Sequence, residues 1–146
     1  MADKEPMDTE EVLKGLRKAL SLQHRSVLQF EIASASLFGL EYQATGEKLW
    51  EWAQLELGDA RLLVGKIAAL GGEPTTDVAP VGWIGDPEEA VELLVETETE
   101  AIETLQDIIP ATGNDGRSEA LEHTLEHVIM RKQAQLDYLL RARRRD

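Results

Sequence analysis

The sequence predicts an all-α protein, a four-helix bundle with one long crossover between the second and third helices. Four stretches place apolar residues at the i, i+3, i+4 spacing of a helix, and none alternates in the manner of a strand. Glycine and proline lie between these stretches, and the middle interruption is much longer than the other two. The four helices are expected at about 8–38, 47–70, 87–109 and 118–143.

The first two helices have recognisable ends. Asp8 is a good N-cap, and Glu11 follows three residues later, as in a capping box. A short break bracketed by Gly39 and Gly46 is expected to separate the two helices. The second helix is expected to stop where two consecutive glycines precede a proline, after Leu70.

The connection to the third helix sets the topology. Residues 73–85 hold two prolines and two glycines without periodicity, well beyond the roughly 2–8 residues usual between bundled helices. Pro87 then begins the third helix at its first position, and a short loop leads to the fourth. Short turns make neighbouring helices antiparallel, whereas the long crossover lets the second and third run parallel. One such crossover among four helices is the ferritin-like arrangement.

Composition excludes several function classes. The chain of 146 residues is expected to form one domain, 1–146, and it contains no cysteine for disulfides, thiolate metal sites or nucleophiles. With 28 acidic and 15 basic residues its net charge is −13, which disfavours nucleic acid and anionic membranes as partners. No apolar run has the length of a membrane span, and the first residues lack the layout of a signal peptide, so a cytoplasmic location is expected.

Three stretches resemble the first three helices of the bacterioferritin family: LRKALSLQHRSVLQFEIASAS, ELGDARLLVGKIAALGGEP and DPEEAVELLVETETEAIETLQDII. The resemblance covers nearly the whole chain. It implies a ferritin-like bundle, a metal centre at its middle, and a homo-oligomer with a dimer as the smallest unit.

The metal ligands that the resemblance implies are largely replaced. In ferritin-like bundles one helix of each pair supplies a Glu and the other a Glu-x-x-His, and the chain contains no Glu-x-x-His. Three of the six corresponding positions keep a carboxylate, Glu56, Asp59 and Glu98. The other three positions correspond to Gln23, Met130 and Gln133.

Loss of these ligands limits the cofactors that the resemblance allows. The position of the haem-binding methionine is Leu57, so no haem is expected, and the tyrosine often found near such sites is Phe30. Two divalent cations need several anionic oxygens and imidazoles around them. The three remaining carboxylates suffice for one iron or another divalent cation, which disfavours a ferroxidase pair.

Helical phase places two of these carboxylates on the core face. Glu56 is in line with Leu49 and Leu63, and Glu98 with Leu94 and Leu105. A buried carboxylate without a partner is costly, so each should be protonated, hydrogen-bonded or bound to a cation. A core in which Gln23 or Gln133 hydrogen-bonds the carboxylates is favoured over a metal site.

Histidine offers a rival site. His123 and His127 are four residues apart on the fourth helix, a spacing that can bind a transition metal, although a surface or interface pair is the favoured interpretation. His24 is expected to face a neighbouring helix or subunit.

The favoured function is that of a bacterioferritin-like protein with an eroded di-iron centre, acting by binding or assembly and connected with iron handling. An enzyme is disfavoured, and an active enzyme would be a ferroxidase-like oxidoreductase. Such an enzyme, or a metal-binding protein, would use a rearranged site in which Glu31 or His127 joins the three carboxylates. A second alternative is a binder of a small apolar molecule, with Gln23, Met130 and Gln133 lining the cavity.

Overall fold

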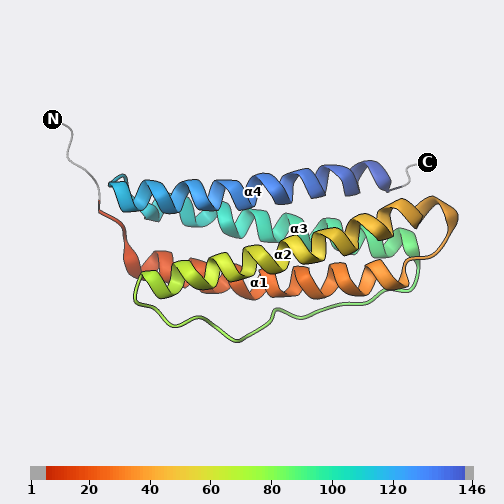
Figure 1. Cartoon of the computed structure of the whole chain (residues 1–146), viewed down its shortest axis with the longest axis horizontal. Helices are drawn as coiled ribbons and strands as arrows, with labels where there is room; N and C mark the ends of the chain where they lie inside the picture. The colour runs from red at the N-terminus through yellow and green to blue at the C-terminus, as the bar shows by residue number, and fades with distance from the viewer. Residues whose placement is uncertain (1–5, 144–146) are drawn as a thin grey trace.

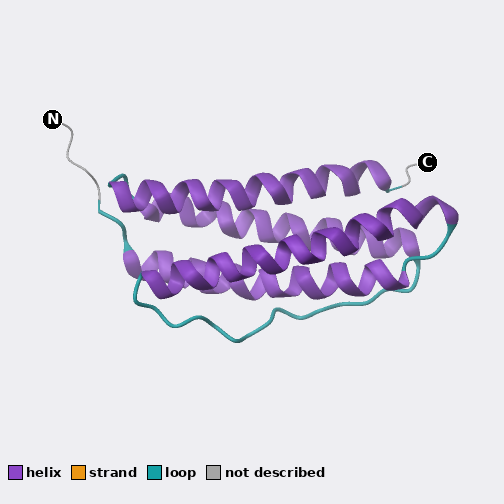
Figure 2. Cartoon of the chain, viewed as in Figure 1, coloured by secondary structure: helices purple, strands orange, loops and turns teal. Residues whose placement is uncertain are grey.

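The computed structural model describes residues 6–143, which form four long helices and two short 3₁₀ segments without a strand (Figures 1 and 2). The predicted fold class is confirmed. The elements are α1 (Thr9–Ser36), η1 (Leu40–Tyr42), α2 (Gln43–Ala69), α3 (Pro87–Ile108), η2 (Ile109–Thr112) and α4 (Gly116–Ala142). None of the helices in this part of the chain is long and apolar enough to cross a membrane.

The helix ends follow from local sequence. The side chains of Asp8, Asp86 and Asp115 accept hydrogen bonds from backbone N–H groups three residues later and so cap α1, α3 and α4. After α2 the chain turns at Gly71, whose φ of 82° suits a residue without a side chain. Three of the four helices therefore begin after an aspartate N-cap.

The second helix begins earlier than predicted, because Gly46 lies inside α2 and does not end the preceding break. A Cβ atom at Gly46 would lie 3.4 Å from the carbonyl oxygen of Ser34 on α1. That distance is an ordinary van der Waals contact, so Gly46 is a glycine within a helix, which the sequence pattern does not distinguish from a glycine in a turn.

The crossover of residues 70–86 runs along the outside of α1 and makes α2 and α3 parallel (Figure 1). Hydrogen bonds hold the crossover against α1. Arg17 Nε donates to the carbonyl oxygen of Glu73 at 2.9 Å. Gly82 N donates to Gln29 Oε1 at 2.8 Å, and Trp83 Nε1 donates to Ser36 Oγ at 3.3 Å. The long connection is thus held against the bundle along its length.

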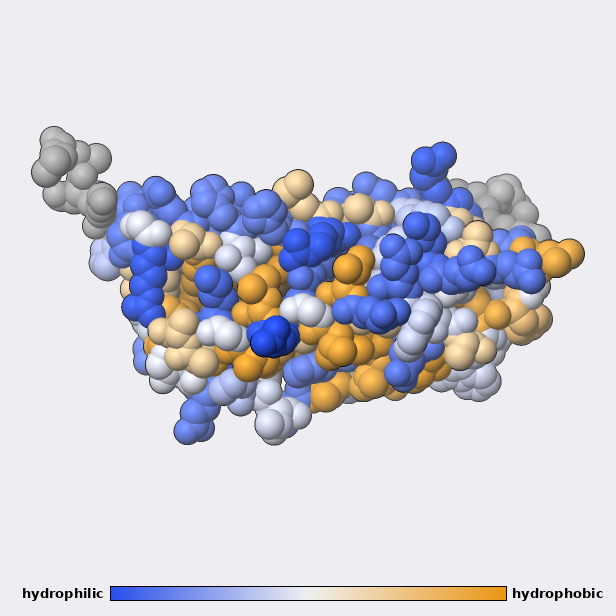
Figure 3. All heavy atoms as spheres, viewed as in Figure 1, coloured by the Kyte–Doolittle hydropathy of each residue, from blue (hydrophilic) through white to orange (hydrophobic). Residues whose placement is uncertain are grey.

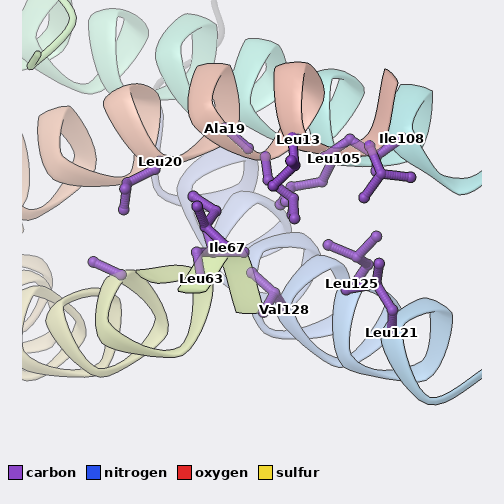
Figure 4. Packing of buried hydrophobic residues seen from close by; sticks show 13 residues of the cluster. Leu13, Ala19, Leu20, Leu63, Ile67, Leu105, Ile108, Leu121, Leu125 and Val128 are labelled. Atoms are coloured by element: carbon purple, nitrogen blue, oxygen red, sulfur yellow. The ribbon is translucent and has the colours of Figure 1, made fainter. Parts of the chain in front are cut away.

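Two apolar clusters fill the two ends of the bundle. The larger cluster brings together aliphatic side chains from all four helices, which point toward one another in Figure 4. The smaller cluster, around Phe30, Leu49 and Leu139, occupies the other end. Between them lies a layer of buried polar and charged side chains, which forms the candidate site.

Candidate functional site

The mid-bundle layer contains two fully buried carboxylates on adjacent parts of the core. Glu56 lies in the middle of α2 and Glu98 in the middle of α3, and neither is exposed to solvent. Helical phase predicts this burial for both residues, and the structure confirms it. A pair of buried carboxylates needs a compensating cation or proton.

The compensating cation is the side chain of Lys132 on α4, which is itself fully buried. Its Nζ atom donates to Glu56 Oε2 at 2.8 Å and to Glu98 Oε2 at 3.2 Å. A third, longer hydrogen bond of 3.4 Å goes to Ser26 Oγ. An ammonium group has three N–H donors, and each of the three has an acceptor here.

Helix α1 completes the layer with two polar side chains. Gln23 Nε2 donates to Glu56 Oε2 and, at 2.9 Å, to the Glu56 carbonyl oxygen. Ser26 Oγ donates to Glu98 Oε1 at 2.5 Å. One of the two expected amide partners, Gln23, therefore meets a carboxylate. We call this set of five residues, Gln23, Ser26, Glu56, Glu98 and Lys132, the lysine cluster.

Burial and charge act in opposite directions within the lysine cluster. Burial raises the pKa of Glu56 to about 7, helped by the nearby charge of Glu98 and opposed by Lys132. Burial alone would lower the pKa of Lys132, but the charges of Glu56 and Glu98 and their hydrogen bonds raise it above its usual value. Lys132 therefore stays charged, while Glu56 titrates near neutral pH. Among the described residues, the atom Glu56 Oε1 is buried without a hydrogen-bond partner.

The third predicted carboxylate has a different partner. Asp59 lies one turn beyond Glu56 on α2 and accepts two hydrogen bonds from Arg131, at 2.6 Å and 3.1 Å. This two-pronged geometry is the strongest form of a carboxylate–guanidinium pair. Both oxygen atoms of Asp59 are therefore engaged outside the lysine cluster.

The two positions of α4 that were expected to face the metal centre, Met130 and Gln133, do not face the core. Met130 is 65% exposed, and Gln133 is an exposed residue that donates to Asp137 on its own helix. The buried stripe of α4 contains Val128, Lys132 and Leu136. Each residue turns a helix by about 100°, so Met130 and Gln133 lie off this stripe and on the surface.

Lys132 is the residue that the sequence interpretation missed. A signal was present, because Lys132 follows Val128 by four residues and precedes Leu136 by four. That spacing is the one used to place Glu56 and Glu98 on the core face. A lysine within an apolar stripe, facing two buried carboxylates, predicts an internal ion pair.

The rearranged metal site does not assemble. Glu31 is exposed, and His127 is exposed on α4, so neither joins Glu56 and Glu98. His123 is also exposed, with Nδ1 3.7 Å from Glu126 Oε2, and metal binding by the pair His123 and His127 stays a prediction. His24 lies half-buried in a surface groove with Leu57 and Arg61.

The apolar ligand cavity lacks its expected lining. Gln23 is buried against Glu56, whereas Met130 and Gln133 lie on the surface, so the three residues do not line one cavity. The centre of the bundle is instead occupied by the side chains of the lysine cluster.

The lysine cluster does not fit a pair of metal ions. A metal centre needs anionic or neutral donors directed at one point, but here an ammonium group lies between the two carboxylates. Within residues 6–143, no three or more His, Cys, Asp or Glu side chains lie together in a group that could hold a metal ion. The donor set therefore matches neither a di-iron nor a single-iron centre.

Four helices with one crossover, and carboxylates projecting inward from α2 and α3, define the class of ferritin-like bundles. The model of the family described as "Ferritin-like domain" matches residues 13–141. The chain belongs to this family. Among curated proteins, none matches the sequence significantly.

Two solved structures are similar over most of the chain. The first is described as ferritin-like, diiron-carboxylate proteins from Bacillus anthracis strain Ames, with 25% identity and a TM-score of 0.85 over 92% of this chain and 96% of that one. The second is a dodecameric thioferritin, the bacterioferritin-related protein from Bacteroides fragilis, with 18% identity and a TM-score of 0.83 over 93% and 86% of the two chains. The second likeness concerns the fold alone.

Proposed function

We propose that this protein is a ferritin-like subunit with an eroded di-iron centre that acts by binding and self-assembly, without ferroxidase chemistry. The observation that carries the proposal is the outer face of α2. Leu57 and Trp50 on this helix are 57% and 53% exposed, and Leu62 is also exposed. Figure 3 shows apolar side chains gathered over the middle of the face that α1 and α2 form. Such a patch in the middle of a long helix marks an interaction surface.

Two glycines on the same helix indicate that the partner packing against this face is another helix. Gly58 and Gly65 lie seven residues apart within α2, where each costs about 1 kcal/mol of helix stability relative to alanine. A Cβ atom at either position would meet nothing within 4 Å in this chain, so internal packing does not require them. Small residues on an outer face permit another helix to approach closely.

The occupant that we propose is a second copy of the chain. The structurally similar protein from Bacteroides fragilis is described as dodecameric, which favours assembly among copies of one subunit. A groove beside Leu57 and Gly58, lined by His24 and Arg61, would receive side chains of the second copy. A chain without cysteine needs no oxidising compartment, and we assign this assembly to the cytoplasm.

Light scattering coupled to size-exclusion chromatography tests the assembly. We expect the unmodified chain to be a dimer or larger, and Leu57→Glu to shift it to the monomer, because the change places a charge in the proposed apolar interface. The matched control is Met130→Glu, which changes a similarly exposed apolar residue on α4 and should leave the mass unchanged. A monomeric unmodified chain would contradict the assembly.

A second measurement tests the absence of ferroxidase chemistry. The apoprotein is mixed with ferrous iron in air, and oxidation is followed by absorbance. We expect no acceleration over buffer, because an ammonium group separates the two carboxylates that would hold iron. Rapid oxidation of two irons per subunit would refute the eroded centre. Iron binding elsewhere, on the histidine pair, would be abolished by His123→Ala together with His127→Ala.

A further inference from the structure

The Lys132 ammonium connects all four helices at one point. It projects from α4 and contacts Glu56 on α2, Glu98 on α3 and Ser26 on α1. The two apolar clusters lie on either side of this point, so the layer between them depends on polar contacts for its cohesion. A metal ion between inward-facing carboxylates would connect the helices in the same way.

We propose that Lys132 is the resident cation of this bundle: its ammonium occupies the position of a metal, makes the fold independent of metal, and excludes divalent cations from Glu56 and Glu98. The proposal concerns the bundle core and does not depend on assembly through α2. Its first consequence is that the folded chain neither needs nor binds a divalent cation at its centre.

The second consequence concerns the chain without Lys132. When both carboxylates are ionised, one ammonium leaves one negative charge in the core, whereas one divalent cation would make the same pair neutral. Removal of the lysine side chain also frees the space beside Glu56 Oε2 and Glu98 Oε2, the two oxygen atoms that it contacts. We therefore expect Lys132→Ala to create a site for one hard divalent cation.

Asp59 explains why the native chain cannot form such a site by a small movement. Its carboxylate is held by Arg131 through two hydrogen bonds, so it is not available as a third ligand. A divalent cation entering the native core would have to displace an ammonium that has all three of its donors satisfied.

The test measures thermal unfolding with EDTA and with 1 mM MnCl₂, in a His123→Ala, His127→Ala background that removes the surface histidine pair. For the chain with Lys132 we expect the same Tm in both conditions. Lys132→Ala should lower Tm by roughly 10 °C in EDTA, because it leaves two buried carboxylates unpaired. Manganese should then raise the Tm of this variant by about 5–10 °C, as expected when the manganese concentration is about 100 times the Kd of the new site.

Two further variants make the result specific. Lys132→Ala combined with Glu56→Gln and Glu98→Gln should lose the response to manganese, because the anionic ligands are gone. Lys14→Ala, which changes an exposed lysine on α1, should behave as the unmodified chain does. Should Lys132→Ala fail to fold in EDTA, Lys132→Gln keeps a hydrogen-bonding group and serves in its place.

Two results would overturn the proposal. One is a manganese-dependent rise in Tm for the chain that retains Lys132, abolished by Glu56→Gln and Glu98→Gln. The other is a Lys132→Ala variant as stable as its parent and indifferent to manganese. Neither result bears on the oligomeric mass, so failure of this inference and failure of the assembly are distinguishable.

Discussion

At the scale of the residue, Glu56 shows how burial turns an ordinary carboxyl into a group that titrates near neutral pH. Its ordinary pKa of 4.5 rises to about 7, because desolvation outweighs the attraction of Lys132. A second carboxylate, Glu98, shares the same ammonium, so the lysine cluster reaches neutrality when Glu56 holds a proton.

This raised pKa predicts a pH dependence of stability with a definite sign. Between about pH 4.5 and pH 7 the folded chain holds the Glu56 proton and the unfolded chain does not. The contribution of Glu56 to the free energy of unfolding is therefore fully present below pH 4.5 and is lost as the pH rises to about 7. The slope is at most about 1.4 kcal/mol per pH unit.

Glu56→Gln removes this titration, so the stability of the variant can be compared with that of the parent at each pH. Urea unfolding of both chains from pH 4.5 to pH 8 should show the parent losing stability relative to the variant across this range, with a constant difference above about pH 7.5. Lys132 stays charged throughout, because its own pKa is raised. A difference that does not change between pH 5 and pH 7 would contradict the assignment.

At the scale of the element, the crossover illustrates how one side chain fixes a long connection. Gln29 on α1 accepts from the Gly82 backbone N–H at 2.8 Å and donates to Thr97 Oγ1 on α3 at 3.2 Å. One buried amide thus links α1, α3 and the crossover. A buried amide whose donor and acceptor are both used specifies geometry more than it adds net energy.

Gln29→Leu should leave the helices in place and loosen the crossover. The Gly82 N–H loses its acceptor, and the Thr97 hydroxyl loses the donor Gln29 but keeps its own hydrogen bond to the Leu94 carbonyl oxygen. The change should lower the free energy of unfolding by about 1–3 kcal/mol. Hydrogen exchange should quicken at Gly82 and its neighbours, with little change in the centre of α2. Gln106→Leu, at an exposed position of α3, provides the control. Unchanged exchange at Gly82 would show that other contacts hold the crossover.

The four helices themselves could be predicted from sequence because their signals are local. Apolar periodicity, the Asp8 cap and the two glycines shortly before Pro74 each act within a few residues. The start of α2 could not be placed in this way, because a glycine inside a helix, such as Gly46, gives the same local signal as a glycine in a turn. The same limit applies to α4, where the buried stripe is decided by which side faces Glu56 and Glu98.

At the scale of the whole molecule, the net charge of −13 is unevenly distributed. Exposed acidic side chains follow one another along α3 at about one per turn, at positions 89, 92, 96, 100, 103 and 107. Arg143 pairs with Glu92 at 3.2 Å and Arg25 with Glu100 at 3.4 Å, both involving exposed carboxylates. Pairs of this kind contribute little, so repulsion along this face remains.

Salt should therefore stabilise the folded chain. The Debye length falls from about 30 Å at 10 mM salt to about 8 Å at 150 mM, which screens exposed charges far more than the buried lysine cluster. We expect Tm to rise by a few degrees between these two concentrations. Glu96→Lys, which breaks the acidic face, should raise Tm at 10 mM salt and have a smaller effect at 150 mM. A Tm that falls with salt would mean that attractive surface pairs dominate.

The sequence by itself determined the helices, their order, the crossover and the burial of Glu56 and Glu98. These features follow from spacing along one chain, which fixes the phase of each helix and the direction of its neighbour. The tertiary structure alone decided what meets those two carboxylates. Lys132 lies 76 residues from Glu56 and 34 from Glu98. The rotation of α4 about its axis, set by packing against three other helices, brings its ammonium between them.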